Sequence, residues 1–186
     1  MNDCRLTSTD SLTLALKRKG ITSWNVLLLF VKNIPYGRNK NRFDFSLVLS
    51  ENRGSCSSKH AFLKQIATLN NIKNVQLILG MYKMETKNTP KIGNILNVNK
   101  LNYLPEAHCY LRVNGKRIDV TSAQANINKI EESILIEKEI SPNQVVSFKV
   151  KYHQEFLKKW ILENNLPFTF KEIWEIREQC IANLSA

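Results

Sequence analysis

The sequence lacks the features that mark membrane, secreted and repeat proteins. No apolar run approaches the ~18 residues that cross a bilayer, and the most apolar stretch, residues 26–31, is far shorter. The first five residues lack the basic-then-apolar pattern of a secretion signal. No internal repeat and no low-complexity segment is present. We therefore expect a globular cytoplasmic protein with no membrane association.

Cysteine pairs are also missing, because the four cysteines are widely spread and form no CxxC motif. This usage is typical of free thiols in a reducing compartment. A zinc site shared by cysteines and histidines is disfavoured, because the neighbours His108 and Cys109 would point to opposite faces of a strand. We expect no metal and no cofactor. Cys109 is predicted to be a core thiol, and Cys4 and Cys180 to take no part in function.

Acidic residues are in deficit, with 16 against 27 basic residues and a net charge of +11. A positive field of this kind attracts polyanions or acidic substrates. The basic residues are scattered, however, and no zinc finger, helix-turn-helix or aromatic-lined groove accompanies them. Specific nucleic-acid binding is therefore disfavoured, whereas an acidic surface partner is compatible with the charge. The basic loop at residues 38–42 would either line the path of an acidic substrate or simply be solvated.

The 186 residues suit one domain, and the 43% hydrophobic content is ordinary for a globular protein. Hydrophobic spacing and turn residues predict helices before and after a block of strands. This order indicates an α+β fold in which N-terminal helices pack on an antiparallel sheet and C-terminal helices follow. The helices are expected at residues 8–19, 24–32, 56–70, 152–164 and 171–183, and the strands at 75–84, 107–121 (a hairpin) and 145–150.

The clearest local signal is Asn114-Gly115 between two alternating runs, which predicts a hairpin with a two-residue turn. In that register Leu111 faces Ile118, and the side chains divide between two faces. One face carries His108, Tyr110, Asp119 and Thr121. The other carries an apolar, core-facing set: Cys109, Leu111, Val113, Ile118 and Val120. His108 and Asp119 are diagonal neighbours, with Cα atoms roughly 7–8 Å apart, so the carboxylate can orient the imidazole and raise its pKa.

Cys56 follows the turn of residues 50–54 and begins a predicted helix. Backbone N–H groups and the helix dipole lower the pKa of a thiol in this position, and a neighbouring imidazolium lowers it further. The Cys56 backbone N–H is also placed to stabilise an acyl oxyanion. Gly54 is expected to give the preceding turn its conformational freedom. His60, one helical turn after Cys56, is expected to be a surface histidine.

These residues together resemble the transglutaminase-like superfamily. The resemblance spans about residues 34–121 and rests on three segments: Gly54-Ser-Cys-Ser-Ser-Lys-His60, Glu106-Ala-His108, and Val113-Asn-Gly-Lys-Arg-Ile-Asp-Val-Thr121. In that superfamily a cysteine opens a helix, a histidine opens a strand, and an aspartate ends the next strand. Where the family often has an aromatic residue just before the aspartate, this chain has Arg117-Ile118.

The resemblance implies a papain-like fold with Cys56 as nucleophile, His108 as general acid and base, and Asp119 as the orienting group. It also makes Tyr36 a candidate for an aromatic residue on the oxyanion side. We read residues 1–186 as a single domain, with a catalytic core at about 24–150 and a helical extension at 151–186.

The implied activity is that of a cysteine enzyme acting on amide or peptide bonds through a thioester, with hydrolysis favoured over amine transfer. The alternative is a non-catalytic or regulatory binding module on the same fold, which would use its basic surface for an acidic partner. The sequence does not identify the substrate or the oligomeric state.

Overall fold

The computed structural model describes residues 3–185, with the side chain of Ser185 outside the description. Four helices precede the first strand: α1 (Ser11–Arg18), α2 (Trp24–Asn33), the short α3 (Leu47–Ser50) and α4 (Cys56–Leu69). The predicted N-terminal helices are confirmed. Asp10 caps α1 by accepting the backbone N–H groups of Leu12 and Thr13. The extended conformation of Ile34, which precedes Pro35, ends α2.

A four-stranded antiparallel sheet occupies the middle of the molecule. Its strands are β1 (Val75–Met84), β2 (Leu104–Val113), β3 (Lys116–Ile118) and β4 (Ile134–Ile140), in the spatial order β3-β2-β1-β4. The β2–β3 hairpin pairs Leu111 with Ile118 and Val113 with Lys116, so the predicted register is confirmed. Both turn residues have positive φ, 48° at Asn114 and 80° at Gly115, as the two-residue turn requires.

The prediction of a strand at residues 145–150 is wrong. That segment ends a 3-10 turn, η4 (Pro142–Val145), and begins the long helix α6 (Ser147–Glu163). Phe148, Tyr152 and Phe156 recur every four residues and pack against the core, which is a helical period that a six-residue window conceals. The fourth strand is instead β4, whose exposed and charged residues weakened its signal.

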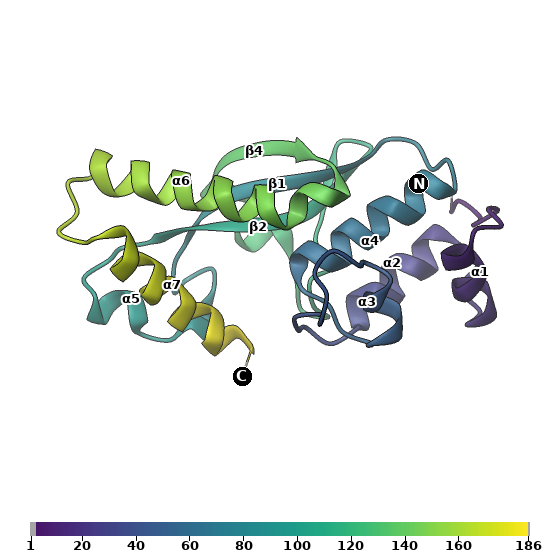
Figure 1. Cartoon of the computed structure of the whole chain (residues 1–186), viewed down its shortest axis with the longest axis horizontal. Helices are drawn as coiled ribbons and strands as arrows, with labels where there is room; N and C mark the ends of the chain where they lie inside the picture. The colour runs from purple at the N-terminus through teal and green to yellow at the C-terminus, as the bar shows by residue number, and fades with distance from the viewer. Residues whose placement is uncertain (1–2, 186) are drawn as a thin grey trace.

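The remaining elements lie on the C-terminal side. Between β1 and β2 come the 3-10 turn η1 (Pro90–Ile92) and the short helix α5 (Ile95–Val98). The 3-10 turns η2 (Ile127–Lys129) and η3 (Glu131–Ser133) lead into β4, and α7 (Phe170–Ser185) follows α6. Figure 1 shows α1 to α4 gathered at one end of the molecule and α5 with α7 at the other, while α6 runs along the strands between them. No helix within residues 3–185 is long and apolar enough to span a membrane.

The two faces of the sheet bury two separate hydrophobic clusters. Alternate residues of β1, such as Leu77 and Leu79, join the helical core of α2 and α4. The intervening residues, such as Ile78 and Tyr82, join a second cluster with α5 and α7. Strands β1 and β2 therefore hold one helical group on each face, because successive side chains point in opposite directions. The result is an α+β architecture in which the central strands β1 and β2 are covered on both faces and the edge strand β4 is largely exposed.

Gly80 makes room for the aromatic ring of Tyr110 on the neighbouring strand. A Cβ at Gly80 would lie 2.8 Å from the Tyr110 ring. The Tyr110 hydroxyl donates a hydrogen bond to Glu137 on β4, and Arg112 and Arg117 bond the same carboxylate at 2.6 and 2.8 Å. This network crosses all the strands beside His108 and fixes the sheet on which the imidazole stands.

Candidate active site

The helix that carries Cys56 has a well-formed beginning. Ser55 and Ser58 form a reciprocal capping box, in which each hydroxyl accepts the backbone N–H of the other residue. Cys56 is thus the first residue of α4. The N–H groups of a first helical turn have no intrahelical acceptor, so those of Cys56 and Ser57 remain available to a negative charge near the thiol.

Position 54 requires glycine because there is no space for a side chain. The expectation that Gly54 supplies conformational freedom to the turn is wrong. Its φ is not among the positive values found in the structure. A Cβ there would lie 2.8 Å from Cγ of Lys59 and 3.1 Å from Oγ of Ser58. The Gly54 N–H also donates to the Pro35 carbonyl at 3.1 Å. The close approach ties the loop after α2 to the start of α4.

His108 and Asp119 meet as the hairpin register predicts. The imidazole Nε2 lies 2.9 Å from Oδ2 of Asp119, and the two side chains are only 15% and 8% exposed. The other oxygen of Asp119 accepts the Thr121 N–H at 2.9 Å. Burial disfavours the imidazolium, but the Asp119 and Cys56 charges outweigh burial and raise the pKa of His108 to about 10. The pKa of Asp119 is held well below its ordinary value, since His108 outweighs the burial of the carboxylate.

Cys56 completes the group, because its thiol and the His108 imidazole act on each other's charge and each shifts the pKa of the other. Burial alone would raise the pKa of the thiol. The positive charges of Lys149 and His108 prevail, and the pKa falls to about 5. The favoured state at neutral pH is therefore a thiolate beside an imidazolium, which is the reactive form of a cysteine. The structure brings the three predicted residues together.

His60 is buried, and the prediction of a surface histidine is wrong. Its side chain is 0% exposed, and its Nε2 accepts the Val120 N–H at 3.0 Å. Nδ1 therefore carries the proton and donates to the Cys56 carbonyl at 2.7 Å. Burial lowers the pKa of His60 to about 4 despite the nearby Asp119. The neutral ring thus bridges the first turn of α4 and the segment that holds Asp119.

Lys59 is a second buried residue of this helix, and it anchors two loops. Its ammonium donates to the carbonyl of Ile34 and, at 2.9 Å, to that of Thr121. Burial lowers the pKa of Lys59 to about 8, against the pull of Asp119. Lys59 and His60 together attach the start of α4 to the end of α2 and to the segment that follows Asp119. No signal in the sequence indicates that Lys59 and His60 are buried. Both lie near the start of a helix, where polar residues usually face solvent.

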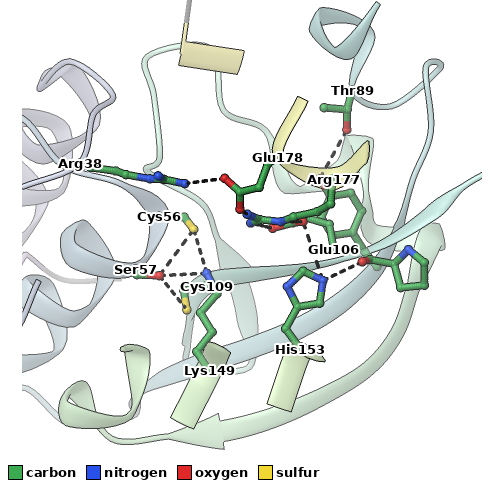
Figure 2. A network of polar contacts seen from close by, with 12 residues as sticks. Arg38, Cys56, Ser57, Thr89, Glu106, Cys109, Lys149, His153, Arg177 and Glu178 are labelled. Carbon is green, nitrogen blue, oxygen red and sulfur yellow. Dashed lines mark hydrogen bonds and ion pairs between the residues drawn. The ribbon is translucent and has the colours of Figure 1, made fainter. Parts of the chain in front are cut away.

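Lys149 is a site residue that the sequence analysis missed. It lies in the first turn of α6, and its ammonium is 3.5 Å from Sγ of Cys56 and 2.9 Å from Oγ of Ser57. Figure 2 shows Lys149 reaching up from α6 to Cys56 and Ser57, and Ser57 in turn contacting Cys109. Its neighbourhood was predicted to be a strand, so nothing in the sequence placed it near the thiol. The core position predicted for Cys109 is confirmed, with 0% exposure.

A second polar cluster lies beside the first. Glu106 on β2 accepts two hydrogen bonds from the Arg177 guanidinium, at 2.7 and 2.8 Å. His153 of α6 approaches the same carboxylate at 3.9 Å and bonds the Pro105 carbonyl at 2.9 Å. Figure 2 shows Glu106, His153 and Arg177 converging from β2, α6 and α7. The cluster fastens the C-terminal helix to the strand that carries His108.

Both clusters open into one cavity of about 1030 Å³. Its lining includes Cys56, His108 and Asp119, and also Tyr36, the candidate aromatic residue on the oxyanion side. The pKa of Tyr36 is raised to about 12 by burial and by the charge of Cys56. Pockets for small ligands usually occupy about 300–1,000 Å³, so the volume of this cavity lies at the upper end of that range.

No protein-family model and no curated protein matches this chain. A solved structure of a candidate cysteine protease from Cytophaga hutchinsonii is similar over 68% of the chain, with 14% identity and a TM-score of 0.41. The matched region covers 41% of that protein, so the present chain spans well under half of its length. A similarity this low does not assign the chain to a family.

Proposed function

We propose that the protein is a transglutaminase-like cysteine enzyme that acts on amide or peptide bonds through a thioester. The observation that carries this proposal is the buried arrangement of Cys56, His108 and Asp119, with a 2.9 Å imidazole–carboxylate hydrogen bond and a thiol of lowered pKa. The proposed core is about residues 24–150, which carries all three groups, followed by the helical extension at 151–186.

In the proposed reaction the Cys56 thiolate attacks the carbonyl carbon, and the carbonyl π electrons move to oxygen. The oxyanion collapses, the C–N bond breaks, and His108 gives its proton to the departing amine. The resulting thioester is attacked by water, whose proton returns to His108. The C–S bond then breaks to release the acid and regenerate the thiolate. Proton transfer of this kind contributes typically about 10²–10⁴ in rate, and Asp119 keeps the ring oriented throughout.

Hydrolysis is the proposed outcome because water reaches any open cavity. Transfer to an amine needs a second substrate at the same carbonyl, and it remains the competing outcome for the same thioester. The two are separated by adding a primary amine to a reacting sample, since a cross-linking enzyme would form the amide product in preference to the acid.

The test is the site and pH dependence of alkylation by iodoacetamide. At pH 6 a thiol with a pKa of about 5 is mostly ionised, whereas one with an ordinary pKa of about 8.5 is under ~1% ionised. We expect mass spectrometry to find Cys56 labelled first at pH 6. Cys109 and Cys180 serve as internal controls, because burial raises the pKa of each to about 11.

His108→Ala provides the matched variant. Removal of the imidazolium raises the thiol pKa, so labelling of Cys56 at pH 6 should fall at least tenfold, while Cys4 should be labelled at an unchanged rate. Equal labelling rates of Cys4 and Cys56 in the wild type would contradict the proposal.

The rim of the cavity supports a preference for acidic substrates or partners. Arg42, Lys91 and Lys129 come from three separate segments and line the same cavity. All three are exposed, and none forms an ion pair within the described part of the chain. Three unpaired cations around one opening favour a ligand that carries carboxylates near the bond to be cut.

The same rim would serve the alternative, a non-catalytic module that binds an acidic partner. Salt and Cys56→Ser separate the two. An acidic peptide that binds through the rim should lose affinity steeply between low and moderate salt, because exposed charges are screened. If Cys56→Ser binds the peptide unchanged and the wild type never cleaves or acylates it, the binding module is favoured. Cleavage by the wild type that Cys56→Ser abolishes supports the enzyme.

A further inference from the structure

The Cys56 sulfur has a second cation besides the one that the triad supplies. Lys149 lies in the first turn of α6, and its ammonium is 3.5 Å from the sulfur. The Ser57 hydroxyl accepts a hydrogen bond from the same ammonium at 2.9 Å. Figure 2 shows the two contacts side by side, with Lys149 entering from below Cys56. The lysine is thus held in place by a neighbour of the nucleophile.

Lys149 differs from His108 in chemistry as well as in origin. An imidazolium can give up its proton during the reaction, whereas a lysine flanked by negative charge keeps its proton. The pKa of Lys149 is raised above its ordinary value, since the charges of Cys109, Cys56 and Glu106 outweigh burial. Of the described lysines and arginines that line the cavity, Lys149 is the one that forms a hydrogen bond with the Cys56 sulfur.

We propose that Lys149 is a further catalytic residue, a permanent cation that contacts the Cys56 sulfur and stabilises its negative charge together with the His108 imidazolium. This inference rests on the proposed thiol chemistry. While His108 is neutral, between protonation of the leaving amine and uptake of the proton from water, the sulfur is bound in the thioester and carries no charge. The second half of the reaction ends with expulsion of the thiolate, and the ammonium 3.5 Å away stabilises that leaving group.

Lys149 moves no proton in this scheme. The proton given to the amine and the proton taken from water both pass through His108, and no bond to the lysine nitrogen forms or breaks. The lysine contributes charge alone, as a fixed cation does at other sites where negative charge develops. Its attachment to Ser57 and to the rigid α6 keeps that charge in place without reorganisation.

The thiol is surrounded by several other titrating groups, which any pH experiment must take into account. From β2 it is affected by His108 and Cys109; from β1, by Tyr82; from the loop after α2, by Tyr36; and from α6, by Lys149. Asp119 and Glu106 act on these neighbours, and Lys59 and His60 share α4 with the thiol. The tyrosines have raised pKa values and the carboxylates lowered ones. Between pH 4 and 9 the groups that change are therefore Cys56 itself, Lys59 with a pKa of about 8, His60 with a pKa of about 4, and His153, whose pKa is lowered.

The experiment compares wild type with Lys149→Met, Lys149→Arg and the control Lys151→Met. Lys151 lies on the same helix, is exposed, and does not line the cavity, so its loss changes net charge equally without touching the site. The rate of Cys56 alkylation by iodoacetamide is measured from pH 4 to 9 by mass spectrometry. Circular dichroism and thermal unfolding establish that each variant is folded.

We expect Lys149→Met to move the alkylation midpoint upward by about 1–3 pH units, the effect of removing an opposite charge within contact distance. Lys149→Arg should restore most of the shift and Lys151→Met should leave the midpoint unchanged. The charged reagent iodoacetate gives a second readout. Its rate relative to iodoacetamide should fall severalfold in Lys149→Met, because the cation that attracts it is gone.

Two failures are distinguishable. If Cys56 of the wild type is not preferentially alkylated at pH 6, the proposed enzyme chemistry itself is wrong. If the wild type behaves as proposed but folded Lys149→Met keeps both the wild-type midpoint and the wild-type reagent ratio, Lys149 is only a structural contact of Ser57 and the inference is overturned. If Lys149→Met does not fold, Lys149→Arg and Ser57→Ala replace it in the experiment. The midpoint of Cys56 alkylation should shift slightly in Lys149→Arg and by an intermediate amount in Ser57→Ala.

Discussion

Two clusters on strand β2, two residues apart, contain the same ingredients and reach opposite electrostatic states. In one, Asp119 contacts His108 at 2.9 Å, and the pKa of the histidine rises to about 10. In the other, Glu106 lies 3.9 Å from His153, and burial lowers the pKa of that histidine. The histidine is charged in the first cluster and neutral in the second.

The difference comes from the other partners of each carboxylate. Glu106 already receives two hydrogen bonds from Arg177, so its charge is neutralised and adds little to His153. Asp119 has no arginine within the described residues, and His108 gains a second anion from Cys56. A histidine beside a carboxylate is therefore not enough to indicate catalysis. The competing cation and the neighbouring nucleophile decide which cluster is reactive and which is structural.

The largest effect is expected where the structural cluster is broken. Arg177→Met would leave Glu106 buried with only the neutral His153 beside it, since the Arg177 and Glu106 side chains are 13% and 7% exposed. Loss of one partner of a buried ion pair costs about 3–5 kcal/mol of unfolding free energy, which urea denaturation would measure. The double variant Glu106→Gln/Arg177→Met should recover most of it. Recovery would fail if Arg177 acts mainly through its contact with Glu178.

The reactive cluster is tested by the titration of its histidine. Asp119→Asn removes the carboxylate charge that favours the imidazolium, so the pKa of His108 should fall by about 1–3 units. NMR of histidine-labelled protein follows all three rings at once. In the wild type we expect one ring to titrate near pH 10 and one near pH 4, with the third below its ordinary range. His153 should be unmoved by Asp119→Asn; a shift of both rings would show that the clusters are coupled.

A smaller effect is expected at the bridge beneath the reactive cluster. His60→Leu leaves the buried Val120 N–H without its acceptor, at a cost of about 1–3 kcal/mol. The pKa of His60 is lowered in the folded state to about 4, against ~6.5 when unfolded. Its contribution is therefore complete above pH 6.5 and is lost as the pH falls from 6.5 through 4. Denaturation at pH 7 and pH 5 should show the variant closer to wild type at the lower pH; an equal difference at both would contradict a neutral His60.

Local signals were sufficient for much of the fold. The strand Val75–Met84, the helix that begins at Cys56 and the hairpin register all follow from hydrophobic spacing and the Asn114-Gly115 turn. The contact of His108 with Asp119 followed from that register, because a two-residue turn fixes which side chains are neighbours. The segment at residues 145–150 was mispredicted because a few alternating residues fit a strand as well as a helix.

Sequence alone therefore determined which residues begin the elements and which share a strand face, since these depend on contacts a few residues apart. Tertiary structure decided the rest. The 93 positions between Cys56 and Lys149 and the 71 between Glu106 and Arg177 carry no local pattern that links them. Only the packing of α6 and α7 beside the sheet brings Lys149 to Cys56 and Arg177 to Glu106. The distances between these charged groups then determine which thiol and which histidine are charged.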